Sequence, residues 1–548
     1  ASDVYKRQII YLLFLFFFCA CTNKEEVNAA DEELVKSFVV NVGNESVEGV
    51  VDNVNHTISL PGINNGLTIS GVDYSLSDGA MVYPDPTTFV GNWDIMEKFQ
   101  IRSASGKEYK YTVLLPDYVK KSNFLSIDFD KKEQQILFVG ADMERSQSFM
   151  QKCVKPELVA EWCFKDIPFE ICRVSYDKQQ ELQEGVKTPE FYNDAIKSMQ
   201  MLKKVNPAIE FWATMKSDYN GYDNENNLPE WICENKKDSY FDTDKYAVFL
   251  ADYLELMHKN NVTISYLATA KEWYSILTPA RSVKILTKLN AECERRGIPK
   301  PNYVDPATWG ISQGVQFIQN TNIQNNKDLY YGFSTHNLNS AESAKMLYEK
   351  FVQASTGLGK PAFADETAYG NGGRTNGVEP QDLSAILTAY LEKVEFYRDG
   401  IQGELFFELF SRGVNAETRG VYFKSGGMPT RMRSYYVLKE FAIGLAGKNK
   451  YYVDPIFTEV DKEVQSMSFV SDNSVFVVLL NTGQANIKNI GVKCENFGKK
   501  VSNVEFTRFT IEDPIEGFKE KTNELLLENM YITDLSPLSI SFIRFDLE

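Results

Sequence analysis

Histidine and cysteine are scarce in this sequence of 548 residues. It contains three histidines and eight cysteines, and no two cysteines have the CxxC spacing. His56, His258 and His336 lie too far apart in the sequence to match a zinc-binding motif. Six widely spaced cysteines between residues 153 and 494 do not suggest a disulfide framework. The sequence therefore predicts no metal centre, and it implies no other cofactor.

Basic residues are also in short supply relative to acidic ones. The chain has 58 Lys and Arg residues against 75 Asp and Glu residues, which gives a formal net charge of -17. A surface of that sign repels phosphate backbones at long range, so nucleic-acid binding is disfavoured. A neutral polymer such as a polysaccharide meets no such repulsion. The apolar content of 43% and the length of the chain predict several globular domains.

The apolar run from Ile9 to Cys21 is shorter than the roughly 20 residues that a membrane-spanning helix needs. Lys6 and Arg7 precede it and polar residues follow it, which predicts a signal peptide over residues 1–21 in preference to a permanent transmembrane anchor. The small residue Ala20 stands before Cys21. This end of the run resembles a bacterial lipoprotein signal, which implies export and membrane anchoring through a lipidated Cys21.

Residues 28–116 contain short alternating apolar stretches separated by Gly, Asn, Asp and Pro. Strand and turn signals at this spacing predict a β-sandwich. The segment resembles the small immunoglobulin-like modules that follow the lipid anchor in many surface glycan-processing lipoproteins. It has no cluster of ionisable groups suited to catalysis, so we expect it to act as a spacer.

Residues 122–440 alternate short apolar runs of strand type with segments that carry apolar residues at helical spacing. Eight such units predict a (β/α)8 or TIM barrel, whose active site lies at the C-terminal ends of the strands. From residue 441 to residue 548 the pattern returns to short strands, which predicts a C-terminal β-sandwich. The predicted barrel strands are 136–141, 168–176, 209–215, 264–270, 301–307, 329–336, 360–366 and 403–410.

Polar residues follow seven of these strands, from the second to the eighth. Glu272 follows strand four and Glu366 ends strand seven, so the two carboxylates should face each other across the barrel mouth. Two facing carboxylates can supply the acid and the nucleophile of glycoside hydrolysis. The full set at the strand ends is Arg173, Lys216, Lys271, Glu272, Asp305, His336, Asn337, Asp365, Glu366 and Glu408.

From about Ser126 to its end, the chain resembles glycoside hydrolase family 30, a family of clan A retaining glycosidases built on (β/α)8 barrels. The segments that carry the resemblance are SIDFDKKEQQILFVGADMERS, FEICRVSYD, FSTHN, PAFADETAYG and RSYYVLKEFAIGL. The resemblance implies a barrel with a side sandwich, Glu366 as the nucleophile and Glu272 as the general acid/base. It also implies that Arg173 keeps Glu366 ionised and that His336 belongs to the same polar network.

One departure from the family concerns the residue before the acid/base. The family normally has Asn there, whose amide bonds the 2-hydroxyl of the sugar, whereas this chain has Lys271. An ammonium group has three donors and no acceptor, so we expect Lys271 to contact the substrate or an acidic neighbour and to favour an anionic or unusually substituted sugar. Trp212 offers a flat face to a sugar ring, and Trp273 a less polar setting beside Glu272. The predicted substrate-binding residues are Arg173, Trp212, Lys271, Trp273, Asp305, His336 and Glu408.

Simpler interpretations stay open for several of these residues. A glutamate after a strand is often a solvated loop residue, Arg173 can form an ordinary ion pair, and His336 and Trp212 can be core residues. For the whole chain we expect an exported, lipid-anchored, monomeric, retaining β-glycoside hydrolase that acts on a polysaccharide or oligosaccharide. The alternative is a non-catalytic surface glycan-binding protein on a degenerate barrel, which Lys271 favours.

Overall fold

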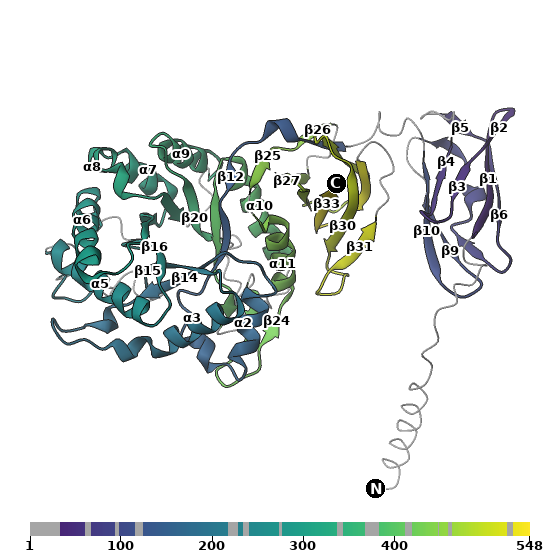
Figure 1. Ribbon diagram of the computed structural model, residues 1–548. Coiled ribbons are helices and arrows are strands. Elements are labelled where there is room, and N and C mark those ends of the chain that lie inside the picture. Colours follow the sequence, from purple (N-terminus) through teal and green to yellow (C-terminus); the bar gives the residue numbers. More distant parts are fainter. Residues whose placement is uncertain are drawn as a thin grey trace, which may run out of the picture. The chain divides into compact units, whose positions relative to one another are not determined.

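In the computed structural model the chain divides into two compact units, Ala1–Ser122 and Asn123–Glu548. Figure 1 shows both units, coloured along the sequence. The residues that the structure describes are 33–60, 67–93, 98–114, 124–216, 228–233, 240–272, 277–336, 344–367, 383–411, 419–447, 449–458, 463–522 and 530–548. The predicted signal peptide, with Cys21, lies outside these ranges.

The first unit is a β-sandwich, as predicted. A three-stranded sheet of order β2-β1-β6 and a five-stranded sheet of order β3-β4-β10-β9-β7 pack together, and β5 pairs with β8. The rings of Phe38 on β1 and Phe99 on β9 stack 5.9 Å apart and join the two sheets. The strands are β1 (Val35–Val42), β2 (Glu45–Glu48), β3 (Val50–Asp52), β4 (Thr57–Ser59), β5 (Leu67–Ile69), β6 (Gly71–Leu76), β7 (Met81–Tyr83), β8 (Gly91–Trp93), β9 (Lys98–Arg102) and β10 (Glu108–Leu114).

The second unit contains the predicted barrel, and each predicted strand overlaps at least one observed strand. Its parallel sheet has the order β17-β16-β15-β14-β13-β21-β20-β19-β18. Strand five is split, so that β17 pairs with strand four and β18 pairs with strand six. The strands are β13 (Phe138–Asp142), β14 (Ile171–Tyr176), β15 (Glu210–Met215), β16 (Ile264–Leu267), β17 (Asn302–Tyr303), β18 (Pro306–Thr308), β19 (Phe333–His336), β20 (Ala362–Thr367) and β21 (Gly403–Phe406).

Helices surround the barrel strands, and local sequence signals explain where they begin and end. The side chain of Asp242 accepts from two backbone N–H groups at the start of α5, and Thr278 followed by Pro279 begins α6. Gly297 ends α6 with a φ of 65°, a left-handed value that suits glycine. The helices are α2 (Pro156–Phe164), α3 (Asn193–Val205), α5 (Thr243–Lys259), α6 (Pro279–Arg296), α7 (Ile311–Gln319), α8 (Thr321–Asn325), α9 (Ala344–Thr356), α10 (Leu383–Arg398) and α11 (Arg433–Leu445).

A β-sandwich packs beside the barrel and shares its core. In Figure 1, α10 and α11 lie between the barrel strands and the yellow sheet. The ring of Tyr390 on α10 meets Phe441 on α11 at 5.4 Å and Phe542 on β33 at 6.0 Å. The remaining strands are β11 (Phe124–Asp128), β12 (Gln135–Ile136), β22 (Phe410–Ser411), β23 (Val421–Tyr422), β24 (Thr430–Arg431), β25 (Lys450–Val453), β26 (Ile456–Thr458), β27 (Val464–Ser471), β28 (Ser474–Asn481), β29 (Ile487–Glu495), β30 (Val501–Phe509), β31 (Phe518–Thr522), β32 (Met530–Leu535) and β33 (Ser539–Leu547).

The predicted start of the barrel at residue 122 is wrong. Strand β11 lies between β26 and β29 in a four-stranded sheet of the sandwich, and β12 pairs with β25 at the edge of its seven-stranded sheet. The chain therefore passes through the sandwich before it enters the barrel at β13. The pairing of β11 with β29 joins segments more than 360 residues apart, and no local pattern reveals such a contact.

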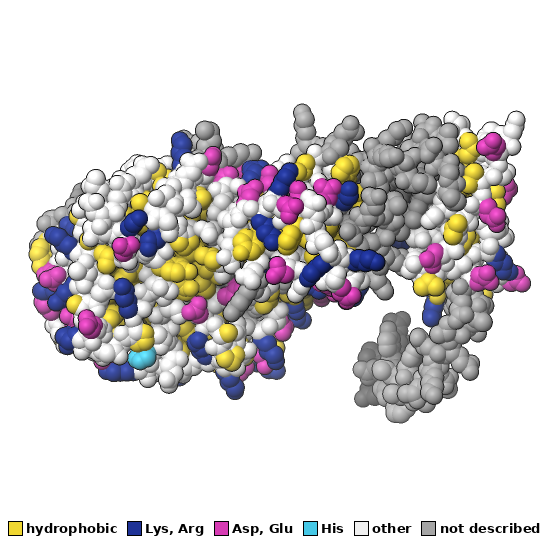
Figure 2. All heavy atoms as spheres, turned by 45° about the horizontal axis from the view of Figure 1, so that its top comes forward, with side chains coloured by type: hydrophobic (Ala, Val, Ile, Leu, Met, Phe, Trp, Pro, Cys, Tyr) yellow, Lys and Arg dark blue, Asp and Glu magenta, His cyan; other side chains and the backbone are white. Residues whose placement is uncertain are grey.

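Charged side chains of both signs are interspersed over the described part of the face that Figure 2 shows. The acidic excess of the sequence is therefore not separated into one basic and one acidic region on this face. Among the residues that the structure describes, no helix combines the length and the apolar character needed to span a membrane.

Candidate active site

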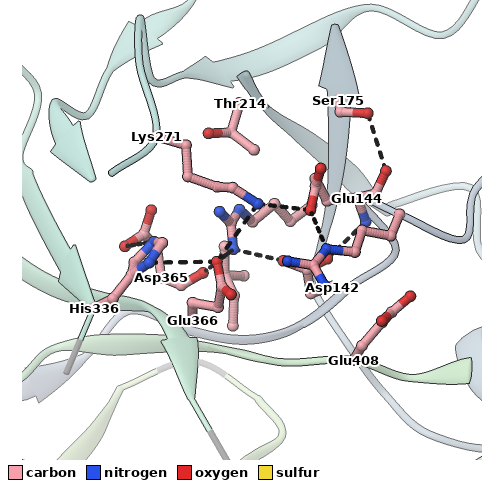
Figure 3. A network of polar contacts seen from close by, with 12 residues as sticks. Asp142, Glu144, Ser175, Thr214, Lys271, His336, Asp365, Glu366 and Glu408 are labelled. Carbon is pink, nitrogen blue, oxygen red and sulfur yellow. Dashed lines mark hydrogen bonds and ion pairs between the residues drawn. The ribbon is translucent and has the colours of Figure 1, made fainter. Parts of the chain in front are cut away.

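The C-terminal ends of the barrel strands carry a buried network of acidic and basic side chains (Figure 3). Arg173 on β14 is its centre. Its Nη1 atom lies 2.8 Å from Oε2 of Glu366 on β20 and 2.6 Å from Oδ2 of Asp142 on β13. The same nitrogen donates to the backbone oxygen of Asp365 at 2.8 Å. One guanidinium group therefore fixes the ends of strands one and seven.

His336, the last residue of β19, lies between the two predicted catalytic glutamates. Its Nδ1 atom is 3.1 Å from Oε1 of Glu272 and 3.4 Å from Oε2 of Glu366. Its Nε2 atom is 3.4 Å from Oδ1 of Asp365. Burial lowers the pKa of His336, but the negative charges of Glu366 and Asp365 outweigh burial and raise this pKa to about 10. At neutral pH His336 is therefore an imidazolium, whose Nδ1–H donates to Oε1 of Glu272 and whose Nε2 atom forms an ion pair with Asp365.

Glu272 has an unusual backbone conformation for its residue type. Its φ is 61°, in the left-handed region, and its N–H donates to the backbone oxygen of Ala307, whose φ is 49°. Non-glycine residues adopt such values at a cost, and strained residues tend to cluster at active sites. This backbone holds the Glu272 side chain so that a carboxyl oxygen lies within 4.8 Å of one on Glu366.

The two carboxylates that share Arg173 have opposite pKa shifts. Burial would raise the pKa of Glu366, but the positive charges of His336, Lys271 and Arg173 outweigh burial and lower this pKa well below its usual range. Burial raises the pKa of Asp142 to about 7, although Arg173 opposes the shift. Of the two groups, Glu366 is therefore the one that stays ionised in acid.

Lys271 contacts an acidic neighbour, one of the two partners expected for it. Its Nζ atom lies 2.7 Å from Oε2 of Glu144 and 4.0 Å from Oε2 of Glu366. The Lys271 side chain is completely buried, and so is that of Glu144. Burial lowers the pKa of Lys271, but the charges of Glu144 and Glu366 reverse the shift and raise it. Lys271 is therefore a cation at neutral pH.

Sequence reasoning missed the contribution of strand one. Asp142 ends β13, and Glu144 and Arg145 follow in the next turn. The Nε atom of Arg145 lies 3.7 Å from Oε2 of Glu144. The rule that found the other residues, a polar side chain directly after an apolar strand, also fits this strand end and would have found them.

Two predicted substrate contacts, Trp212 and Asp305, have side chains that pack against or bond to other parts of the protein. Trp212 is completely buried in the barrel interior, where its ring stacks on Tyr266 at 5.5 Å and meets Phe363 edge-on at 5.8 Å. Asp305 is completely buried as well and accepts from the backbone N–H of Thr269 at 2.7 Å and from Oγ of Ser282 at 2.7 Å. Trp212 therefore packs inside the barrel, whereas Asp305 links the barrel to Ser282 on α6.

Two other predicted substrate-binding residues, Glu408 and Trp273, are not seen within the network. Figure 3 shows Glu408 beside the network but separate from it, and its Oε2 atom lies 3.4 Å from Nη2 of Arg419. Trp273 lies outside the residues that the structure describes. Of the predicted site residues, the structure brings together Arg173, Lys271, Glu272, His336 and Glu366.

The network could be mistaken for a metal site, because Glu272, His336 and Glu366 each offer a ligand atom within 4.8 Å of the others. Arg173 and Lys271 already place positive charge 2.8 Å and 4.0 Å from Oε2 of Glu366. These charges repel a divalent cation and take over its role of balancing the carboxylates. We therefore assign no metal to this cluster.

The fold resembles solved structures of glycoside hydrolases. A family 30 subfamily 8 xylanase from Clostridium acetobutylicum matches with a TM-score of 0.57 and 16% identity, over 78% of this chain and 100% of the xylanase. An endo-β1,6-glucanase matches at 0.56 and 12% identity, over 78% of this chain and 94% of the glucanase. The second unit has a glycoside hydrolase family 30 type fold. A conserved exported protein from Bacteroides fragilis has the same TM-score of 0.56 and 12% identity, over 77% of this chain and 100% of that protein.

Sequence comparisons add one match. Residues 6–128 match a family model described as a domain of unknown function (DUF4971). The match covers the first unit and ends with β11, so it does not include the barrel. No curated protein sequence matches the chain.

The burial of Trp212 leads to a stability prediction. We expect Trp212→Ala to lower the free energy of unfolding by about 3 to 5 kcal/mol, because it empties part of a close-packed barrel interior. Trp212→Phe, the matched control, should lose less. Equilibrium denaturation of the parent and both variants measures the difference. Unchanged stability together with a weakened affinity for glycan would instead restore the predicted contact with sugar.

Proposed function

We propose that the protein is a retaining β-glycoside hydrolase that cleaves a polysaccharide or oligosaccharide by double displacement. The observation that carries the proposal is that one carboxyl oxygen of Glu272 lies within 4.8 Å of one carboxyl oxygen of Glu366. Retaining enzymes place their two carboxyl groups about 5 to 5.5 Å apart, whereas inverting enzymes need about 6.5 to 9.5 Å to admit a water molecule. The short separation favours direct attack by one carboxylate.

In the first step, Glu366 attacks the anomeric carbon and Glu272 donates its proton to the glycosidic oxygen. A bond forms between Glu366 and the sugar as the glycosidic C–O bond breaks, and the leaving sugar departs with the proton from Glu272. In the second step Glu272 takes a proton from water, whose oxygen attacks the same carbon and releases the Glu366 carboxylate. Two inversions restore the β configuration.

The electrostatics of the network support this division of roles. A nucleophile must be ionised, and Glu366 has a pKa well below its usual range. Arg173 on β14 and His336 on β19 hold its Oε2 atom in place from different sides of the barrel. His336 also donates to Oε1 of Glu272, which orients the carboxyl group that must deliver the proton.

The solved structures of similar fold support a polysaccharide as the substrate, because two of them are described as a xylanase and an endo-β1,6-glucanase. We further propose that the protein is exported and anchored to the membrane through Cys21. The basic residues and apolar run before Cys21 support that proposal, as does the similar fold of a protein described as exported.

A second candidate function is non-catalytic glycan binding. The observation that favours it is the buried Lys271–Glu144 ion pair, which occupies a position where the resemblance predicts an amide for the sugar 2-hydroxyl. Incubation with β-glucans, xylans and host-type glycans separates the two functions. We expect released saccharides. Retention of the protein on a glycan gel without any release would identify a binding protein instead.

A further inference from the structure

Glu144 and Lys271 form an ion pair that the family resemblance does not predict. The two residues follow β13 and β16 and are 127 positions apart in the chain, yet their charged atoms lie 2.7 Å apart. Neither side chain is exposed. Such a pair is costly to bury, and removal of one partner leaves an uncompensated charge. Stability alone therefore does not explain why this ion pair is buried.

The pair extends a line of alternating charges that contains the proposed nucleophile. Lys271 lies between Glu144 at 2.7 Å and Glu366 at 4.0 Å. On the other side of Glu366, Arg173 lies 2.8 Å from Glu366 and also forms an ion pair with Asp142. Beyond Glu144 lies Arg145 at 3.7 Å. The distance from Lys271 to Glu366 is too long for a hydrogen bond but short enough for a strong interaction between buried charges.

We propose that Glu144 and Lys271 are a positioning pair: Lys271 keeps Glu366 ionised, and Glu144 keeps Lys271 from bonding directly to Glu366. The proposal rests on the proposed function, in which Glu366 attacks the sugar. A lysine ammonium is a compact charge on a flexible stem. Without Glu144, it would turn to the nearest remaining carboxylate, which is Glu366, and a direct bond to that carboxylate would weaken its attack on the sugar.

Other charged groups also face Glu366 and have to stay constant in a test. They come from five parts of the barrel and are Arg173 on β14, His336 on β19, Asp142 at the end of β13 with Arg145 after it, Glu272 after β16, and Asp365 on β20. Substitutions confined to the pair leave all of them in place. Any change in the titration of Glu366 can then be assigned to the pair.

The test compares Lys271→Met, Glu144→Gln, the double variant and Lys271→Arg in the full chain. Lys271→Met removes a positive charge, so the pKa of Glu366 should rise by about one unit or more and the acid limb of kcat/KM should move to higher pH. Glu144→Gln removes a negative charge and releases Lys271, so this pKa should not rise, while kcat should fall about tenfold or more. In the double variant, the pKa of Glu366 should lie between the values in the two single variants. In Lys271→Arg, this pKa should equal that of the parent.

Difference infrared titration reads the same pKa without turnover. Each variant is compared with its Glu366→Gln counterpart, so that the carboxyl band lost between them belongs to Glu366. Melting temperatures show that each variant is folded. If the parent releases no sugar, the proposed function fails while the titration still tests the pair. An unchanged Glu366 pKa in Lys271→Met, or a rise in Glu144→Gln, would overturn the proposal.

Discussion

Glu366→Gln should abolish turnover, with a loss of at least about 10⁴-fold in kcat. The amide is close in shape to the carboxylate but has no negative charge with which to attack the anomeric carbon. Arg173 and His336 stay in place to bind the amide oxygen, so the barrel should remain folded and glycan binding should persist. Saccharide release by the variant and the parent, at equal and saturating glycan, measures the loss.

Glu408→Gln is a matched control for that result. It makes the same chemical change at the end of strand eight, where Figure 3 shows Glu408 separate from the network around Glu366. Glu408 is a predicted substrate contact, so we expect this variant to raise KM but to keep kcat within about tenfold of the parent. Equal losses of kcat in both variants would mean that Glu366 has no special role in turnover.

Glu272→Ala should have an effect that depends on the leaving group. On natural glycans, whose leaving alcohol needs protonation, the loss should be about 10² to 10⁴-fold. On an activated aryl glycoside the first step no longer needs an acid, so the intermediate on Glu366 should accumulate and the aryl alcohol should appear as a burst. Stopped-flow absorbance records the burst. Glu272→Gln, which keeps the size of the side chain, serves as the matched control. The same loss on both substrates, without a burst, would count against Glu272 as the acid/base.

The barrel was readable from the sequence because its strands are buried on both faces. Such strands appear as continuous apolar runs, and β13 and β14 are buried along their whole length. The break in strand five was not readable, because it depends on which neighbour each half of the strand pairs with. The same holds for β11, whose place in the sandwich depends on a partner near the other end of the chain.

The candidate site was readable in part for a related reason. Topology alone places residues at strand ends near one another, which brought Arg173, Glu272 and Glu366 together. Topology does not tell which way a side chain points, so Trp212 was assigned to substrate although it fills the barrel interior. The partner of Lys271 is Glu144, 127 positions away, and no local signal connects the two.

The central claim is that Glu366 attacks the sugar directly and Glu272 then activates water, so that the product keeps its β configuration. Proton NMR of the first hemiacetal released from a β-linked glycan tests it most directly, provided that spectra are recorded before mutarotation. The geometry of Glu272 and Glu366 predicts that the β anomer appears first and that the α anomer grows in later. An α anomer that appears first would contradict the double-displacement mechanism.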